Sequence, residues 1–430
     1  MKNHSWNIRR GRIVDPTGNR DEIADLFVRN GIIAASETGA EGPVQEIDAQ
    51  GLTVIPGLLD LHVHFREPGG ESSETVASGS QAAAHGGFTA VVAMPNTQPP
   101  VDTPERVRRQ VDLGRAAGPV RVWPSGCLTQ ARQGRVVADL AGMAEAGAIA
   151  FTDDGQTVPA TEVMRAAMVQ CATLRRPLLD HALDAGAAGA GIMHEGPCAR
   201  RLRLPGIPSS AESRIVERDI ALCRETGCTV HIQHVSARAS VEQIAAARRA
   251  GLPVSGEVTP HHLWFTDARL ETGDPNYKMN PPLRSEEDRQ ALLAALANGT
   301  LSALATDHAP HAATGQSQSL QEAPFGIIGL ETAVPATYTV CVHSGLMPLM
   351  EWVHRWTTGP AAIIGLPAPA LSPGQPANIV LLDLDAEIVP DPTSFLSKST
   401  NSPFVGMSLR GRVVHTLHEG RTTWRAGHHD

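Results

Sequence analysis

Several features typical of secreted, membrane-bound or nucleic-acid-binding proteins are missing from this sequence of 430 residues. Its longest apolar runs are short and are broken by Gly, Pro or charged residues, so none predicts a transmembrane helix. The N-terminal stretch MKNHSWNIRRGRIVDPTGNR lacks the apolar core of a signal peptide. The formal net charge of −9 argues against nucleic acid or an anionic membrane as a partner.

Cysteine is also sparse, while the rest of the composition is ordinary. The six cysteines are scattered and form no paired motif, which predicts reduced, buried thiols in a cytoplasmic protein. With 42% hydrophobic and 19% charged residues, the chain has the composition of a globular protein. Its length suffices for one large domain and one smaller domain.

Eight apolar runs alternate with helical stretches from residue 58 onward. Near-continuous apolar strands separated by helices are typical of a parallel sheet that is covered on both faces. Eight such units predict an α/β fold with a closed (β/α)₈ barrel of the TIM type. The runs are LLDLHVHF (58–65), FTAVVAMPN (88–96), VRVWPSG (120–126), AIAFTDD (148–154), PLLDHA (177–182), TVHIQHVS (229–236), PVSGEVTP (253–260) and LSALATDH (301–308).

Helix ends are predicted between these runs. Ser209 and Glu212 have the spacing of a capping box, and the helix that they begin is predicted to stop at Gly227. A second helix runs through ASVEQIAAARRAG and stops at Gly251. Generic α/β packing explains both helices.

The two ends of the chain contain short β-like pieces. Neither end is large enough for a core of its own, so we expect the two to pair into one small β-sandwich domain. Residues 1–57 and 366–430 are the predicted parts of this domain. Residues 58–365 are the predicted barrel.

Histidines and aspartates follow several of the eight runs. Residues i and i+2 of a strand face the same side, so both histidines of HVH point into the predicted barrel mouth. The carboxyl ends of barrel strands form the active-site face, where the other side chains also converge. Nitrogen and oxygen ligands without cysteine suit zinc or a similar divalent ion, and the ring is large enough for two. The residues are His62, His64, Asp153, Asp154, His181, His234 and Asp307.

These residues lie in motifs that resemble the amidohydrolase superfamily and, within it, the class I dihydroorotases. The resemblance covers nearly the whole chain. It implies a zinc-dependent cyclic amide hydrolase that cyclises N-carbamoyl-L-aspartate reversibly to L-dihydroorotate and water, in de novo pyrimidine biosynthesis. The motifs are DLHVHFREPG, AMPNTQP, FTDDG, LLDHALD, VHIQHVSA, GEVTPHHLWFTD, YKMNPPLR, ATDHAPH and PFGIIGLET.

The resemblance implies metal ligands and a catalytic residue. One or two zinc ions would be held, the more buried one by the HVH pair. Asp154 would bridge two metals, with Asp153 as the alternative. Asp307 would be both a ligand and the acid/base that works with hydroxide formed on the metal. The implied ligands are His62, His64, Asp154, His181, His234 and Asp307.

The resemblance also implies a substrate site. Arg66 lies one alternation after His64, and its planar fork would give a substrate carboxylate two hydrogen bonds. Asn96 has a turn cap as its alternative role. Residues 311–326 are predicted to be either a mobile loop that closes over substrate or a passive linker. The implied substrate-binding residues are His64, Arg66, Asn96, Asn280, His311, Phe325 and Gly326.

Lysine is nearly absent, and this excludes one way of bridging two metals. Many binuclear amidohydrolases use a carboxylated lysine on the fourth strand. The only lysines here are Lys2, Lys278 and Lys398, and none lies between the HVH pair and His234. If two metals are bound, an aspartate must therefore bridge them, which disfavours a hydantoinase-like protein.

Two alternative functions stay open. One is another cyclic-amide hydrolase, such as an allantoinase or hydantoinase. The other is a catalytically silent scaffold for aspartate transcarbamoylase, although a scaffold would be expected to lose ligands that are present here. One departure from the family is ESSET at residues 71–75, where a lysine–glutamate pair is common. The resemblance further allows aspartate transcarbamoylase as a partner and a homodimer as the assembly.

Overall fold

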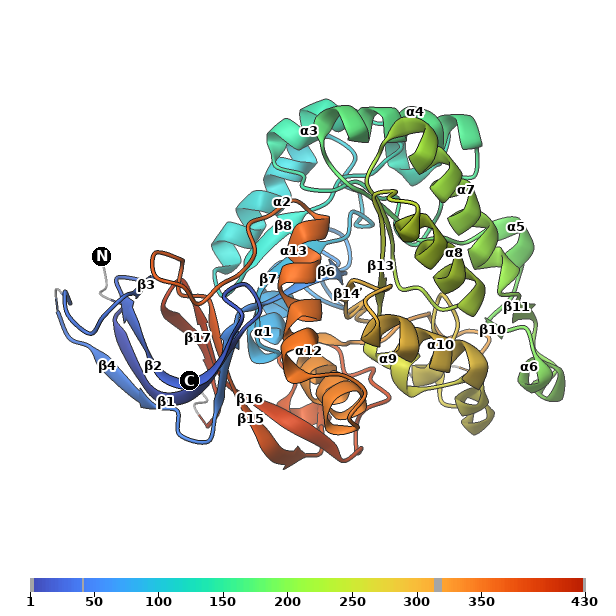
Figure 1. Cartoon of the computed structure of the whole chain (residues 1–430). Helices are drawn as coiled ribbons and strands as arrows, with labels where there is room; N and C mark the ends of the chain where they lie inside the picture. Colours follow the sequence, from blue (N-terminus) through green and yellow to red (C-terminus); the bar gives the residue numbers. More distant parts are fainter. Residues whose placement is uncertain (1–3, 41, 313–318, 428–430) are drawn as a thin grey trace.

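The computed structural model describes residues 4–40, 42–312 and 319–427 of the chain. These residues form two kinds of β-sheet. A mixed, mostly antiparallel sheet lies on one side, and parallel strands surrounded by helices make up the rest (Figure 1). The protein is therefore of the α/β class. None of the helices in the described part of the chain combines the length and apolarity needed to span a bilayer.

The parallel strands form two sheets, in the orders β6-β7-β8 and β9-β12-β13-β14. Single parallel bridges join Gly126 to Phe151, Phe151 to Leu178, and His308 to Val63. Followed through these bridges, the pairing leads from β6 round to β14 and back to β6. The strands are β6 (Leu58–Val63), β7 (Phe88–Ala93), β8 (Arg121–Pro124), β9 (Leu178–Asp180), β12 (Val230–Ile232), β13 (Val254–Val258) and β14 (Ala303–Leu304).

The fourth predicted run, residues 148–154, is not a regular strand. Only Phe151 forms ladder-type bridges, on both sides. The Ile149 amide donates to the Pro124 carbonyl at 3.1 Å, and the Leu179 amide donates to the Phe151 carbonyl at 2.9 Å. The run therefore lies between β8 and β9 as predicted, but its pairing stops early because the end of the run turns toward side-chain partners in the site.

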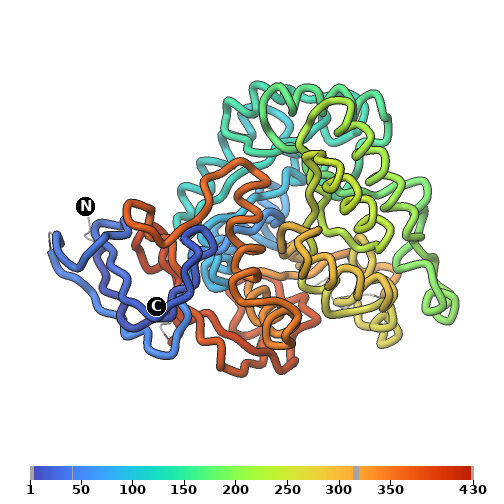
Figure 2. The backbone as a smooth tube through the Cα atoms, in the orientation of Figure 1, coloured from blue at the N-terminus to red at the C-terminus, as the bar shows by residue number. Residues whose placement is uncertain are grey.

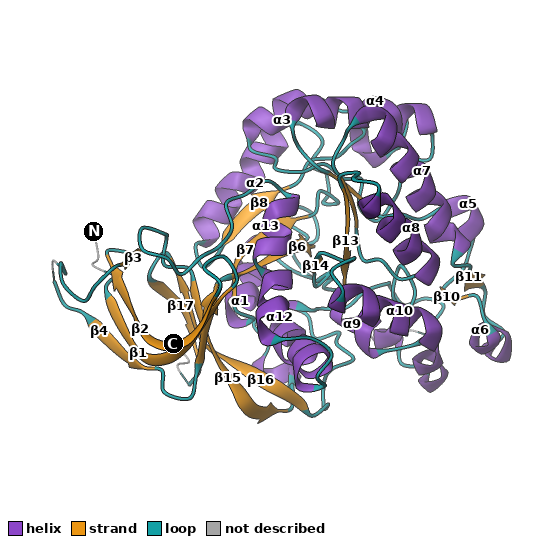
Figure 3. Cartoon of the chain, viewed as in Figure 1, coloured by secondary structure: helices purple, strands orange, loops and turns teal. Residues whose placement is uncertain are grey.

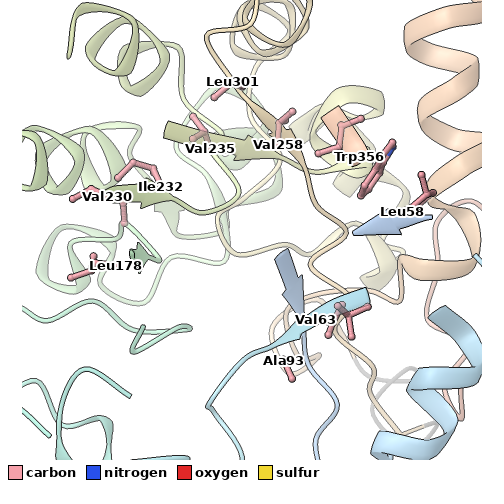
Figure 4. Close-up of a cluster of buried hydrophobic side chains, with 14 of the residues drawn as sticks. Leu58, Val63, Ala93, Leu178, Val230, Ile232, Val235, Val258, Leu301 and Trp356 are labelled. Atoms are coloured by element: carbon pink, nitrogen blue, oxygen red, sulfur yellow. The ribbon is translucent and has the colours of Figure 1, made fainter. Parts of the chain in front are cut away.

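Helices surround the parallel strands (Figure 3). They bury side chains of the strands, including Leu58, Val63, Leu178, Val230 and Val258, all of which Figure 4 shows together with Trp356. The helices are α1 (Val76–His85), α2 (Pro104–Ala117), α3 (Leu140–Ala146), α4 (Thr161–Leu174), α5 (Ala185–Ala188), α6 (Pro197–Leu202), α7 (Ser210–Thr226), α8 (Arg238–Arg249), α9 (Pro260–Trp264), α10 (Glu286–Ala297), α11 (Ala333–Thr337), α12 (Leu349–Trp356) and α13 (Thr358–Ile363).

The predicted capping box at the start of α7 is wrong. Ser209 has helical backbone angles, and its side chain makes no cap hydrogen bond. The buried Glu212 carboxylate instead accepts the amides of Ser236 and Ala237 and lies 3.5 Å from Arg284 Nη2. A tertiary network therefore takes the carboxylate that the local motif needed. The helix does end at Gly227, which has φ +70°.

The first and last segments of the chain meet in the mixed sheet, in which β1 runs parallel to β4 and β5 and the other pairs are antiparallel (Figure 2). Its order is β17-β16-β15-β5-β1-β2-β3, with β4 on β1, so it is one continuous sheet and not the two sheets of a predicted sandwich. A register shift between Ile8 and Gly11 bends β1, as bulges do, and lets the sheet curl over its own apolar core. The strands are β1 (Trp6–Asp15), β2 (Arg20–Arg29), β3 (Ile32–Ala34), β4 (Gln45–Asp48), β5 (Thr53–Pro56), β15 (Ile379–Ile388), β16 (Leu409–His418) and β17 (Arg421–Arg425).

Two short strands, β10 (Met193–His194) and β11 (Gly206–Ile207), pair with each other apart from the three other sheets of the described residues. Residues 313–318, which are part of the predicted substrate loop, lie outside the described residues.

Candidate metal centre

The predicted ligands come together at the carboxyl ends of the parallel strands. β6 carries His62, and His64 follows its last residue, where the His64 amide donates to the His308 carbonyl at 2.9 Å. His181 follows β9, and His234 lies two residues after β12. All four imidazoles are buried.

Asp154 is shared by two groups of ligand-type atoms, each within 4.8 Å: one with His62 and His64, the other with His181 and His234. Its Oδ1 lies 3.2 Å from His62 Nε2 and 3.8 Å from His181 Nδ1, and its Oδ2 lies 3.6 Å from His64 Nε2. In the second group, His181 Nδ1 and His234 Nε2 are 2.8 Å apart. One carboxylate therefore lies between both histidine pairs.

The neighbouring carboxylates have different surroundings. Asp307 Oδ1 lies 3.1 Å from His64 Nε2 and 3.5 Å from His62 Nε2, so Asp307 faces the same space as Asp154. Asp153 is turned the other way and accepts hydrogen bonds from the amide and hydroxyl of Thr129. Of the adjacent pair, only Asp154 reaches the histidines.

Electrostatics within the cluster favour a bound cation. Burial raises the pKa of a carboxyl, but the surrounding imidazoles outweigh it and hold the pKa of Asp154 and of Asp307 below the usual value. Burial lowers the pKa of His181, and it lowers that of His234 to about 3, so both imidazoles are neutral as metal ligands must be. Burial also opposes protonation of His62, yet the facing carboxylates raise its pKa.

Buried ligand-type atoms without hydrogen bonds test whether the site fits a metal ion. His62 Nε2 and Asp154 Oδ1 are both buried and lie 3.2 Å apart, but neither makes a hydrogen bond of acceptable geometry among the described residues. Buried polar atoms normally find a partner, so such orphans need an explanation. Four imidazoles, two carboxylates and these buried atoms without hydrogen bonds make a donor set that fits a divalent metal.

Three residues of this region have a left-handed backbone. Arg66, His234 and Asp307 have φ of +42°, +32° and +49°. Residues other than glycine rarely adopt such angles, and they persist where the surrounding structure imposes them, often at functional sites. The backbone is thus strained at one predicted substrate-binding residue, Arg66, and at two predicted metal ligands, His234 and Asp307.

The predicted substrate-binding residues form a rim around the ligands. Arg66 Nε donates to the Pro310 carbonyl at 3.3 Å, and His311 Nε2 lies 2.7 Å from the Phe325 carbonyl. Asn280 Nδ2 lies 3.4 Å from His181 Nε2, while its Oδ1 is buried and unpartnered among the described residues. The rim therefore offers a buried acceptor and a guanidinium next to the ligand cluster.

Asn96 makes contacts that the sequence did not predict. Its Oδ1 lies 3.0 Å from His64 Nδ1, and its Nδ2 donates to Asp154 Oδ2 at 3.2 Å. The Asn96 amide therefore orients two ligands from the rim side.

Glu257 is a site residue that sequence reasoning missed. It is fully buried on β13, with Oε1 2.9 Å from His62 Nδ1 and Oε2 3.0 Å from His231 Nε2. It also accepts the His234 amide at 3.3 Å. Burial opposes ionisation, yet the imidazoles of His231 and His62 lower the pKa of Glu257 to about 2. A carboxylate bound to the outer nitrogen of a ligand histidine fixes the orientation of the ring and its tautomer. In the sequence, the one sign of this residue was a charged side chain within an apolar run.

Comparison with known proteins agrees with this geometry. A family model described as dihydro-orotase-like matches residues 51–240. The chain is 43% identical over 408 residues to the dihydroorotase of Geobacillus sp. (strain WCH70), covering 94% of this chain and 96% of that protein. It is 44% identical over 404 residues to the dihydroorotase of Bacillus caldolyticus, covering 94% and 95%.

Solved structures give the same fold. The L-hydantoinase (dihydropyrimidinase) of Arthrobacter aurescens superposes with a TM-score of 0.86 at 26% identity, over 98% of this chain and 96% of that one. The fold and the histidine–aspartate cluster define a member of the amidohydrolase superfamily. Within that superfamily, the chain belongs to the dihydroorotase family.

Proposed function

We propose that the chain is a class I dihydroorotase, which interconverts N-carbamoyl-L-aspartate and L-dihydroorotate in pyrimidine synthesis. Similarity to dihydroorotases over nearly the whole chain supports this. The observation that carries the proposal is the position of Asp154, which lies between two histidine pairs where a bridging lysine would otherwise be needed.

The proposed architecture is a closed (β/α)₈ barrel over residues 58–365. The circular order of strand pairings supports it. The proposed small β domain is made of residues 1–57 and 366–430, whose strands share one sheet. In this arrangement the barrel supplies all the residues of the site.

The proposed cofactor is zinc, as one or two ions. When bound, zinc lowers the pKa of a coordinated water toward 7 and polarises the scissile carbonyl. Asp154 would be the shared ligand, and Asp307 would complete the set. The proposed protein ligands are His62, His64, Asp154, His181, His234 and Asp307.

Asp307 is the proposed acid/base. Its lowered pKa keeps the carboxylate ionised at neutral pH, so it starts as a base. In ring opening, Asp307 accepts a proton from the attacking water as the oxygen bonds to the ring amide carbon. The carbon–nitrogen bond then breaks, and Asp307 returns the proton to the departing nitrogen. Ring closure reverses these steps, with loss of water.

The proposed specificity lies in a clamp for the free carboxylate of the substrate. Arg66 would supply charge-assisted hydrogen bonds, because only its Nε is used by a protein acceptor in the described part of the chain. His311 and Asn96 would flank that carboxylate. Asn280 and the backbone of Phe325 and Gly326 would contact the ring, and His64 would lie beneath it.

The proposed setting is the cytoplasm. A homodimer and a complex with aspartate transcarbamoylase are the assemblies that we propose to examine. Size-exclusion chromatography with and without the transcarbamoylase separates them.

The experiment that tests the function follows ring opening of L-dihydroorotate by ultraviolet absorbance, using purified protein supplemented with zinc. We expect turnover of L-dihydroorotate and none of hydantoin or allantoin. Activity on hydantoin alone would contradict the proposal in favour of a hydantoinase. Silence that persists after the transcarbamoylase is added would favour a scaffold.

A further inference from the structure

Lys278 is a buried lysine with an unusual set of partners. Its side chain is almost fully enclosed, and no carboxylate pairs with its Nζ among the residues that the structure describes. Nζ donates to the carbonyls of Gln321 at 3.2 Å and Ala323 at 2.6 Å, and it lies 4.5 Å from the centroid of the Phe325 ring. The ammonium is therefore held by two backbone dipoles and an aromatic face, all on one short segment.

That segment, residues 319–326, is attached to the site at further points. The Gly326 amide donates to the Lys278 carbonyl at 2.9 Å, and Asn401 Nδ2 donates to the Gly326 carbonyl at 3.1 Å. Gly326 has φ +104°, and a Cβ there would lie 2.7 Å from Ala309 Cβ. Both the backbone angle and the close approach require glycine, so the path of the chain at this point is closely defined.

The segment leads directly to the catalytic region. Ile327 forms a parallel bridge with His308, the residue after Asp307. Lys278 itself lies two residues before Asn280, which approaches the ligand His181. Lys278 thus links the backbone at Phe325 and Gly326 to the chain segment that carries Asn280.

From these contacts we infer that Lys278 is a positioning residue for substrate binding. It holds the backbone at Phe325 and Gly326 in the place where the ring of the substrate meets it. This inference rests on the proposed function, which puts that backbone against the ring. Because a buried charge is stable only with its partners in place, Lys278 can stay buried only while residues 321–325 are docked.

The variant that tests the inference is Lys278→Met, which keeps the apolar stem and removes the donors and the charge. We expect the KM for L-dihydroorotate to rise by about tenfold, the ratio that corresponds to about 1.4 kcal/mol, while kcat stays within about threefold. Zinc content should be unchanged. Amide hydrogen exchange of residues 319–326 should become faster in the zinc-loaded protein.

Two further variants separate positioning from general destabilisation. Lys278→Arg retains the charge and should recover part of the lost affinity. Lys398→Met is the matched control, because Lys398 is exposed and its Nζ donates to the Glu71 carbonyl, while the Lys398 backbone amide that donates to Glu74 is kept in the variant. It should leave KM and exchange at wild-type values.

The outcomes are distinguishable from a failure of the proposed function. If the wild-type protein opens no L-dihydroorotate, the proposed function fails, and the inference fails with it. If the wild-type protein is active and Lys278→Met keeps the wild-type KM and exchange, the inference alone is overturned. Should Lys278→Met not fold, Phe325→Leu removes only the aromatic partner, and an unchanged KM in that variant would overturn the inference equally.

Discussion

The ligand cluster and the substrate rim are built differently, although they touch. The cluster stands at the ends of parallel strands, and its side chains contact one another and Glu257 beneath them. The rim comes from loops, and two of its residues, Arg66 and His311, are held by backbone carbonyls. Under the proposed function, the strand ends therefore hold the residues of the chemistry, and the loops hold the residues that select the substrate.

The largest effect is expected at the cluster. Asp307→Asn keeps the shape of the side chain but removes the base, so kcat should fall by about 10³-fold. Circular dichroism of the same sample should match the wild type, and its zinc content separates loss of the base from loss of a metal ligand. Appreciable turnover by this variant would remove Asp307 from the acid/base role.

A smaller effect is expected at the rim. Arg66→Ala should lower kcat/KM for L-dihydroorotate by about 100-fold, because a charge-assisted carboxylate contact of about 3 kcal/mol is lost. Arg66→Lys, the charge-conserving control, should recover only part of this loss because lysine lacks the planar fork. Metal content is the readout that separates rim from cluster, and a loss of zinc in Arg66→Ala would break the comparison.

Glu257, which contacts the ligand His62 at Nδ1, should strengthen the binding of zinc. Glu257→Gln leaves a buried amide beside His62 Nδ1, so the affinity for zinc should fall by about 10- to 100-fold. Competition with a chelator measures this directly, without reference to turnover. Glu71→Gln, at an exposed position outside the cluster, is the control. An unchanged zinc affinity would mean that Glu257 only fills the core.

The smallest effect is expected at Asn280. Loss of one neutral hydrogen bond is worth about 1 kcal/mol, so Asn280→Ala should raise KM by about fivefold. The buried, unpartnered Oδ1 of Asn280 is the reason to expect an effect on substrate. A fall in zinc affinity instead would place Asn280 with the cluster through its contact to His181.

The ligand cluster and the substrate rim also differ in how well the sequence predicted them. Strand alternation and the position of strand ends were enough to bring His62, His64 and His181 together. Glu257 could not be found in this way, because no spacing marks a charged residue in mid-strand. The substrate-binding role of Asn96 stays a prediction, and the contacts of its amide with His64 and Asp154 were not predicted.

The fold, too, could be predicted from the sequence only in part. Apolar runs located the parallel strands, but a local motif failed at Glu212, whose carboxylate is taken by Ser236 and Ala237 from a distant loop. The pairing of the chain ends followed from their small size. Composition did not reveal that they form one continuous sheet, nor the register shifts in it, such as the one between Ile8 and Gly11.

The most direct test of the account is anomalous X-ray diffraction from crystals of the zinc-loaded protein. The account predicts zinc in contact with the Asp154 carboxylate, and, at full loading, two peaks on either side of it, one near His62 and one near His181. Zinc bound without Asp154, or placed away from these histidines, would contradict the claim that this aspartate is the shared ligand of the site.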